Sequence, residues 1–96
     1  MITELAILRV IPGRETNFEQ DFAKAGAYIS SIKGYIKHSL HKCIEQANQY
    51  MLYVEWERLE DHTIGFRQSA AYLEWKKLLH HYYDPFPTVE HYTLVS

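Results

Sequence analysis

The sequence predicts an α+β domain whose elements follow the order β-α-β-β-α-β. Apolar, branched and aromatic residues gather in runs of strand length near both ends of the chain and twice in its middle. Two stretches between these runs carry apolar residues at helical spacing. The chain has 96 residues, of which 47% are hydrophobic and 15% aromatic. This composition is that of one globular domain rather than of a disordered chain.

The first strand is expected at residues 4–11, a nearly continuous apolar run that ends at the turn signal Pro12-Gly13. The next segment has apolar residues at spacings of four, three, four and three, which predicts one buried helix face: Phe18, Phe22, Ala25, Ile29 and Ile32. Acidic residues near its start suit the helix dipole, and Gly34 is expected as the glycine that ends it.

Two further strands are expected at residues 35–45 and 50–56, both rich in aromatic and branched residues. A second helical region begins near Leu59, and Ser69 is a suitable N-cap for a fresh helical segment. The sequence Asp84-Pro85-Phe86-Pro87 ends that segment, and residues 89–95 form the last strand.

This order is the split β-α-β pattern of ferredoxin-like domains. It predicts a single domain over residues 1–96, with a four-stranded antiparallel sheet and both helices on one face. The first strand is apolar on both faces, with Leu5 and Ile7 on one side and Ala6 and Leu8 on the other. Because a sheet with one wet face normally alternates apolar and polar residues, a homodimer that covers the second face is expected. The alternative is a monomer with a partly apolar exposed sheet.

Charge and composition exclude several classes of function. The net charge is −2 and no basic stripe is present, so no nucleic-acid partner is expected. No stretch approaches the roughly 20 apolar residues of a membrane span, and the N-terminal residues lack the features of a signal peptide. The one cysteine, Cys43, allows neither an internal disulfide nor a zinc pattern. A cytoplasmic protein is therefore expected.

A series of residues in order and spacing carries a resemblance that spans nearly the whole chain: Gly13, Phe18, Gly34-Tyr35, residues 53–57 (YVEWE), Glu60, His62, Phe66, Ser69, Tyr72 and residues 89–92 (VEHY). With these residues the chain resembles the antibiotic biosynthesis monooxygenase family, within the dimeric α/β-barrel superfamily. The resemblance implies a homodimer whose two sheets face each other as a barrel. It also implies that the last strand reaches onto the neighbouring subunit, and that each subunit has a pocket between sheet and helices.

Some members of this family oxygenate aromatic polyketides or quinols with molecular oxygen and use neither metal nor flavin, whereas others degrade haem. The haem-degrading pattern is not kept, because the first strand has no Asn, Phe66 stands at the Trp position and Lys76 at the position of the iron-ligating His. A lysine ammonium has no lone pair to give to iron. The resemblance therefore implies a cofactor-independent monooxygenase acting on a small phenolic, quinol or polyketide-like aromatic. The alternative is a non-catalytic dimeric module that binds a small aromatic ligand.

Cofactor-independent oxygenation needs a base, a donor that orients the substrate anion, and a pocket that excludes water. His62 is the first candidate base, because histidine titrates near neutral pH and the residue lies four positions before Phe66. Tyr72 is the second candidate catalytic residue, because its phenol can donate to a substrate oxygen. The alternative for His62 is a surface or capping role in a first helical turn.

Four further residues are expected to line the substrate site: Phe66, His91, His38 and Trp75. The alternatives are ordinary core positions for the aromatic residues and structural roles for the two histidines. Glu55 and Glu57 are more simply explained as salt-bridge partners of Arg9 or Lys37 than as a carboxylate pair, and Arg67 as a residue on a solvated helix face. No metal site is expected, because neither adjacent nor strand-spaced histidines have ligand geometry.

Overall fold

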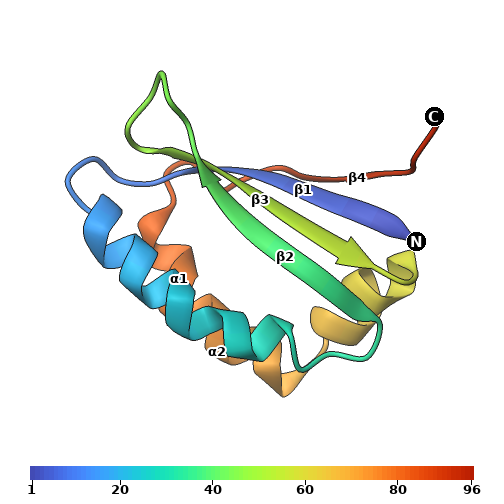
Figure 1. Cartoon of the computed structure of the whole chain (residues 1–96). Coiled ribbons are helices and arrows are strands. Elements are labelled where there is room, and N and C mark those ends of the chain that lie inside the picture. The colour runs from blue at the N-terminus through green and yellow to red at the C-terminus, as the bar shows by residue number, and fades with distance from the viewer.

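The computed structural model describes all residues from 1 to 96 and shows a four-stranded antiparallel sheet in the order β2-β3-β1-β4. All helices lie on one face of this sheet (Figure 1). The elements are β1 (Ile2–Arg9), α1 (Glu15–Ile29), β2 (Tyr35–Lys42), β3 (Gln49–Trp56), the π-helical turn η1 (Asp61–Phe66), α2 (Ala70–Leu79), the 3-10 turn η2 (His80–Tyr82) and β4 (Val89–Tyr92). The predicted ferredoxin-like order is confirmed.

The ends of several elements differ from the predicted ones. Helix α1 ends at Ile29 rather than at Gly34, because the N–H groups of Ser31 and Ile32 donate to carbonyl oxygens three residues back instead of four. Strand β1 ends at Arg9, because the N–H of Val10 donates to Asn48 O (2.9 Å) outside the regular ladder. Strands β2 and β4 are each three residues shorter than expected at their C-terminal ends. These shifts leave the order of the elements unchanged.

Ser69 caps α2 as predicted. It has extended backbone, and its Oγ accepts a hydrogen bond from the N–H of Tyr72 (3.1 Å). The segment before it winds as a π-helical turn, in which the N–H of Arg67 donates to His62 O (3.2 Å). This wider turn directs both His62 and Phe66 toward the sheet, where they are buried.

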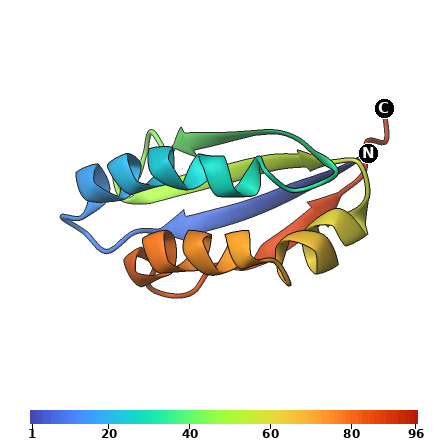
Figure 2. The ribbon, with the colours of Figure 1, turned by 90° about the horizontal axis from the view of Figure 1, so that it is seen from below.

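The core fills the space between the sheet and the two long helices. In Figure 2, which looks at the sheet from the helical side, α1 lies over β2 and β3, and α2 lies on the side of β1 and β4. The predicted apolar face of α1 is confirmed for the four residues that lie within the helix and are buried, Phe18, Phe22, Ala25 and Ile29. They pack with the inward side chains of β1 and β3 in one cluster.

The opposite face of the sheet is not covered by any other part of the chain (Figure 1). Leu5 and Ile7 of β1 and Met51 and Tyr53 of β3 are half-buried there. The sheet of the single chain is open and does not close into a barrel. A barrel of the predicted kind therefore requires a second copy of the chain.

Strand β2 carries an irregularity near its start. Regular alternation along the strand would place Ile36 on the same inward face as His38 and Leu40. The pairing with β3 shifts between Tyr35 and Lys37, which leaves Ile36 as an extra residue that is 41% exposed.

Neither helix of the fold has the length and hydrophobicity that crossing a membrane would require.

The turn between α1 and β2 touches the turn η1. Gly34 has a φ of +90°, and a Cβ atom at this position would collide with the side chain of Asp61. Asp61, the first residue of η1, also accepts a hydrogen bond from the N–H of Arg58 (3.0 Å). A glycine at position 34 therefore allows η1 to lie close against the sheet, where it presents His62.

Candidate functional site

A cavity of about 340 Å³ lies between the inward face of β1 and helix α2. Its floor consists of small and aliphatic residues from the sheet, including Ala6, Leu8 and Leu52. Its wall is mainly aromatic and contains Phe66, Tyr72, Trp75, Tyr83 and Phe86. The polar groups are few: Glu4, His62, Arg67 and His80, with the hydroxyls of the tyrosines. Such a composition suits a small aromatic ligand that is held by a few polar contacts.

The structure brings five of the six sequence-predicted site residues together. His62, Tyr72, Phe66 and Trp75 line the cavity. His91 does not line the cavity itself, contrary to expectation; it lies behind His62 and is joined to it by a hydrogen bond between Nε2 of His91 and Nδ1 of His62 (2.7 Å). Their roles toward a substrate remain predictions.

His38 lies outside this cavity. Strand β2 is at the opposite edge of the sheet from β4 and is covered by α1 instead of α2. The His38 ring is hydrogen-bonded to the hydroxyl of Tyr35 and packs edge-on against Phe22. This position corresponds to the alternative of a satisfied, partly buried histidine, so the prediction that His38 lines the same pocket as His62 is wrong.

A buried polar chain runs along one wall of the cavity. Glu4 is 4% exposed and His62 is 3% exposed. The Oε1 atom of Glu4 accepts a hydrogen bond from Nε1–H of Trp56 (2.9 Å) and lies 3.3 Å from Nε2 of His62. Glu4 and His91 are also direct neighbours in the β1–β4 pairing. When Glu4 is ionised, the contacts of Glu4 with Trp56 and His62 and the hydrogen bond between His62 and His91 can all form together if each histidine carries its hydrogen on Nε2.

Burial shifts the two central groups in opposite directions. Loss of water raises the pKa of Glu4 to about 7, although the Trp56 hydrogen bond and the charge of Arg67 oppose this rise. Burial, together with the charges of Arg67 and His91, lowers the pKa of His62 to about 3. With these pKa values His62 is uncharged near pH 7, and Glu4 is a mixture of carboxylic acid and carboxylate.

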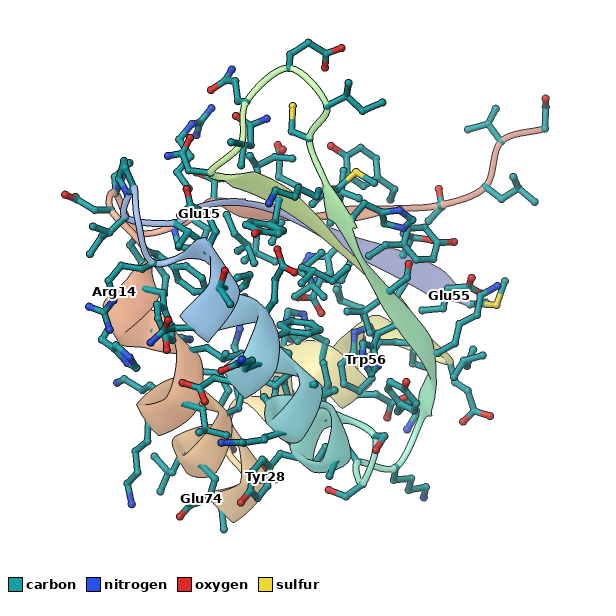
Figure 3. All side chains as sticks on the ribbon, turned by 60° about the vertical axis from the view of Figure 1, so that its left-hand side comes forward. Arg14, Glu15, Tyr28, Glu55, Trp56 and Glu74 are labelled. Carbon is teal, nitrogen blue, oxygen red and sulfur yellow. The ribbon has the colours of Figure 1, made fainter.

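Ring packing holds the His62 imidazole in place. It stacks on Trp56 with centroids 5.5 Å apart and an interplanar angle of 17°. Figure 3 shows Trp56 on the inner side of the sheet, whereas its neighbour Glu55 points to the other face. There Glu55 pairs with Lys37 (3.2 Å) and accepts from the hydroxyl of Tyr53 (2.8 Å), which confirms the salt-bridge interpretation for Glu55. Glu57 forms no such bridge, so the interpretation is wrong for that residue. Phe66 meets Tyr72 and Trp75 edge-on, so it is both core and cavity wall.

One polar residue of the site, Glu4, was missed in the sequence. It could have been found by strand alternation, because it shares a face with Ala6 and Leu8. Arg67 is exposed, as its assignment to a solvated helix face expects, but it also contributes to the lining of the cavity. No group of three or more His, Cys, Asp or Glu side chains is arranged to hold a metal ion.

The sequence model of the antibiotic biosynthesis monooxygenase family matches residues 1–78. The chain belongs to this family. A protein of Bacillus subtilis (strain 168), uncharacterized protein YczJ, is 56% identical over 92 residues, which cover 96% of this chain and 97% of that protein. The predicted resemblance is thus confirmed over most of the chain.

Solved structures agree with this assignment. A crystal structure assigned to the same family, from Bordetella bronchiseptica, is 38% identical with a TM-score of 0.95, and the match covers 99% of this chain and 97% of that one. SnoaB from Streptomyces nogalater, described as a cofactor-independent oxygenase, is 22% identical with a TM-score of 0.76, and the match covers 99% of this chain and 93% of that one. At that identity the likeness to SnoaB shows the fold alone.

Proposed function

We propose that this protein is a cofactor-independent monooxygenase that oxidises a small phenolic, quinol or polyketide-like aromatic compound with molecular oxygen. Family membership supports the reaction class. The observation that carries the proposal is the aromatic cavity with the buried Glu4–His62 pair in its wall. Such a site combines a proton acceptor with an apolar space from which a ligand would displace water.

The chemistry requires a substrate that can give up a proton and then electrons. Loss of the hydroxyl proton to the Glu4–His62 pair gives a phenolate, which reacts with oxygen at a ring carbon. One oxygen atom stays on the ring as a new carbonyl. The other leaves as water with the hydrogen of that ring carbon and the hydroxyl hydrogen. A phenol and oxygen thus give a quinone and water, and no external reductant is consumed.

The residues on the cavity wall take complementary roles in this proposal. Tyr72 donates a hydrogen bond to the phenolate oxygen, and His62 belongs to the pair that takes up the hydroxyl proton. Phe66 and Trp75 stack against the rings of the substrate. His91 supports His62 from behind through their hydrogen bond.

We further propose that the working form is a homodimer in the cytoplasm. The uncovered sheet face carries Leu5, Ile7, Met51 and Tyr53, which a second copy would remove from water. Residues 93–96 extend away from the sheet, with Leu94 87% exposed and Val95 94% exposed (Figure 1). A facing subunit would cover these apolar side chains as well.

A second candidate function is binding of a small aromatic molecule without turnover. The loss of the Trp that the resemblance implies at the position of Phe66 favours it. The Phe66 side chain is 2% exposed and has no polar group to offer a substrate. In this case the cavity would hold its ligand, and oxygen would not react.

Oxygen uptake by purified, metal-depleted protein distinguishes the two functions. A panel of phenols, naphthalene diols and anthrone-type compounds is mixed with the protein in an oxygen electrode, and quinone formation is followed by absorbance. The oxygenase proposal predicts uptake that depends on the protein concentration and persists with a chelator. Tight binding of the same compounds without uptake would favour the binding module.

A further inference from the structure

Glu4 is the only acidic residue among those that line the cavity. Its two carboxyl oxygens are in different surroundings. Oε1 is engaged by Trp56 and His62, whereas no protein group hydrogen-bonds Oε2. The carboxyl group is therefore held by one oxygen, and the other is free to meet a ligand.

His62 lines the same wall, but both of its ring nitrogens are occupied. Nδ1 is bonded to His91 and Nε2 faces Glu4. A substrate hydroxyl would have to break one of these contacts to reach a nitrogen lone pair. The imidazole is also fixed by its stacking on Trp56, so a large reorientation would disturb the core.

We propose that Glu4 accepts the hydroxyl proton of the substrate at Oε2, and that His62 and His91 are positioning residues that hold its carboxyl group in place. This inference rests on the proposed oxygenase function and assigns its base. In the step, the O–H bond of the substrate breaks, a new O–H bond forms at Oε2, and the electron pair remains on the substrate oxygen. The proton leaves Glu4 when the second oxygen atom departs as water.

The electrostatics of the wall agree with this assignment. A general base is most effective when its pKa lies near the working pH. The pKa of Glu4 is raised to about 7, whereas that of His62 is lowered to about 3, which makes the imidazole a weak base. Three charged or titratable groups surround Glu4: His62 on η1, His91 on β4 and Arg67 after η1. The remaining titratable groups of the cavity lining are Tyr72, His80 and Tyr83.

The first test is the pH profile of the Glu4→Gln variant. The amide keeps the acceptor for Trp56 and the shape of the side chain, but it takes up no proton. We expect kcat to fall about 100- to 10,000-fold, with a smaller change in KM, and the ionisation near neutral pH to disappear from the profile. The exposed Glu57→Gln, one residue past β3, is the matched control and should keep wild-type kinetics.

The His62→Asn variant tests whether His62 is itself the base or only positions Glu4. If His62 only positions Glu4, this variant retains an ionisation in its pH profile, displaced from that of wild type. If the profile of His62→Asn loses its ionisation while Glu4→Gln keeps wild-type kcat and its ionisation, the assignment of Glu4 is wrong.

A binding measurement tests Glu4 without turnover. The probe is 4-nitrophenol, whose phenolate absorbs visible light, added in weakly buffered solution while proton release is followed. In wild type, phenolate should form on binding without release of a proton, because Glu4 takes it up. In Glu4→Gln, every phenolate formed should release one proton to the medium.

This second measurement keeps the two proposals apart. Proton transfer from bound 4-nitrophenol to Glu4 in a protein that consumes no oxygen would overturn the oxygenase function and support Glu4 as the acceptor. Equal proton release by wild type and Glu4→Gln, or failure of wild type to bind the probe, would overturn the role of Glu4.

Discussion

Oε1 of Glu4 on β1 lies 3.3 Å from Nε2 of His62 on η1, and both side chains are almost completely buried. A strand thus supplies an acid, and the turn that packs on that strand supplies the ring that holds it. The two groups are uncharged together when Glu4 is protonated, which is the arrangement that burial favours. The protonation state of this pair therefore affects both the free energy of unfolding and the chemistry that the cavity can support.

The pair predicts a particular dependence of stability on pH. Burial raises the pKa of Glu4 from 4.5 to about 7, so its contribution to the free energy of unfolding decreases as the pH rises through this range. Burial lowers the pKa of His62 from 6.5 to about 3, so its contribution increases over that lower range. Where the two ranges overlap, the slopes oppose each other in wild type.

Glu4→Gln removes only the first of these slopes. Its free energy of unfolding, relative to wild type, should therefore increase by about 1–2 kcal/mol from pH 5 to pH 7. Urea unfolding at a series of pH values measures this difference. Glu57→Gln serves as the control, and a parallel pH dependence of Glu4→Gln and wild type would contradict the raised pKa.

Gly34→Ala should be more destabilising than Gly13→Ala. Both glycines have positive φ, +90° and +92°, so alanine is strained at either position. A Cβ at Gly13 meets no atom within 4 Å, whereas one at Gly34 collides with Asp61. We expect about 1 kcal/mol for Gly13→Ala and about 2–4 kcal/mol for Gly34→Ala, measured by urea unfolding. Equal losses would show that the Asp61 contact relaxes freely.

Ser69→Ala should weaken the start of α2. The change removes the Oγ that accepts from the N–H of Tyr72 (3.1 Å), at a cost of about 1 kcal/mol in the free energy of unfolding. Ser30→Ala, at an exposed position after α1, provides the comparison and should cost less. Thermal unfolding of the two variants measures the difference, and a neutral Ser69→Ala would mean that the cap contributes little.

Charges on the uncovered sheet face should prevent dimer formation. In the variant that combines Ile7→Lys and Met51→Lys, two half-buried apolar side chains of this face become cationic. Sedimentation equilibrium should show a dimer for wild type and a monomer for the variant, because lysines would be buried without partners. Leu73→Lys on the exposed side of α2 should remain dimeric. A monomeric wild type would refute the proposed assembly.

Much of the fold follows from periodicity in the sequence. The buried face of α1 was predicted from Phe18, Phe22, Ala25 and Ile29, because one helix period relates these residues. The uncovered apolar face was predicted from Leu5 and Ile7, because side chains alternate along a strand. Both signals are local, so neither depends on how distant segments meet.

The parts of the site that were missed depend on distant contacts or on irregular turns. His38 faces inward, yet the strand order places it at the far edge of the sheet from His91. Arg67 is exposed as expected, and its additional place in the cavity lining depends on a π-helical turn that ordinary helical spacing does not describe. Strand alternation places Glu4 on the inward face, but its partners Trp56 and His62 come from distant segments of the chain.

The most direct test of the proposed function is turnover of a responsive phenol from the panel under ¹⁸O₂, with metal-depleted protein and mass spectrometry of the products. The proposed monooxygenase reaction predicts one labelled oxygen atom in each quinone and the other in water, together with a loss of labelled product in Glu4→Gln. Unlabelled quinone under ¹⁸O₂, or no quinone from any phenol that binds the cavity, would contradict it.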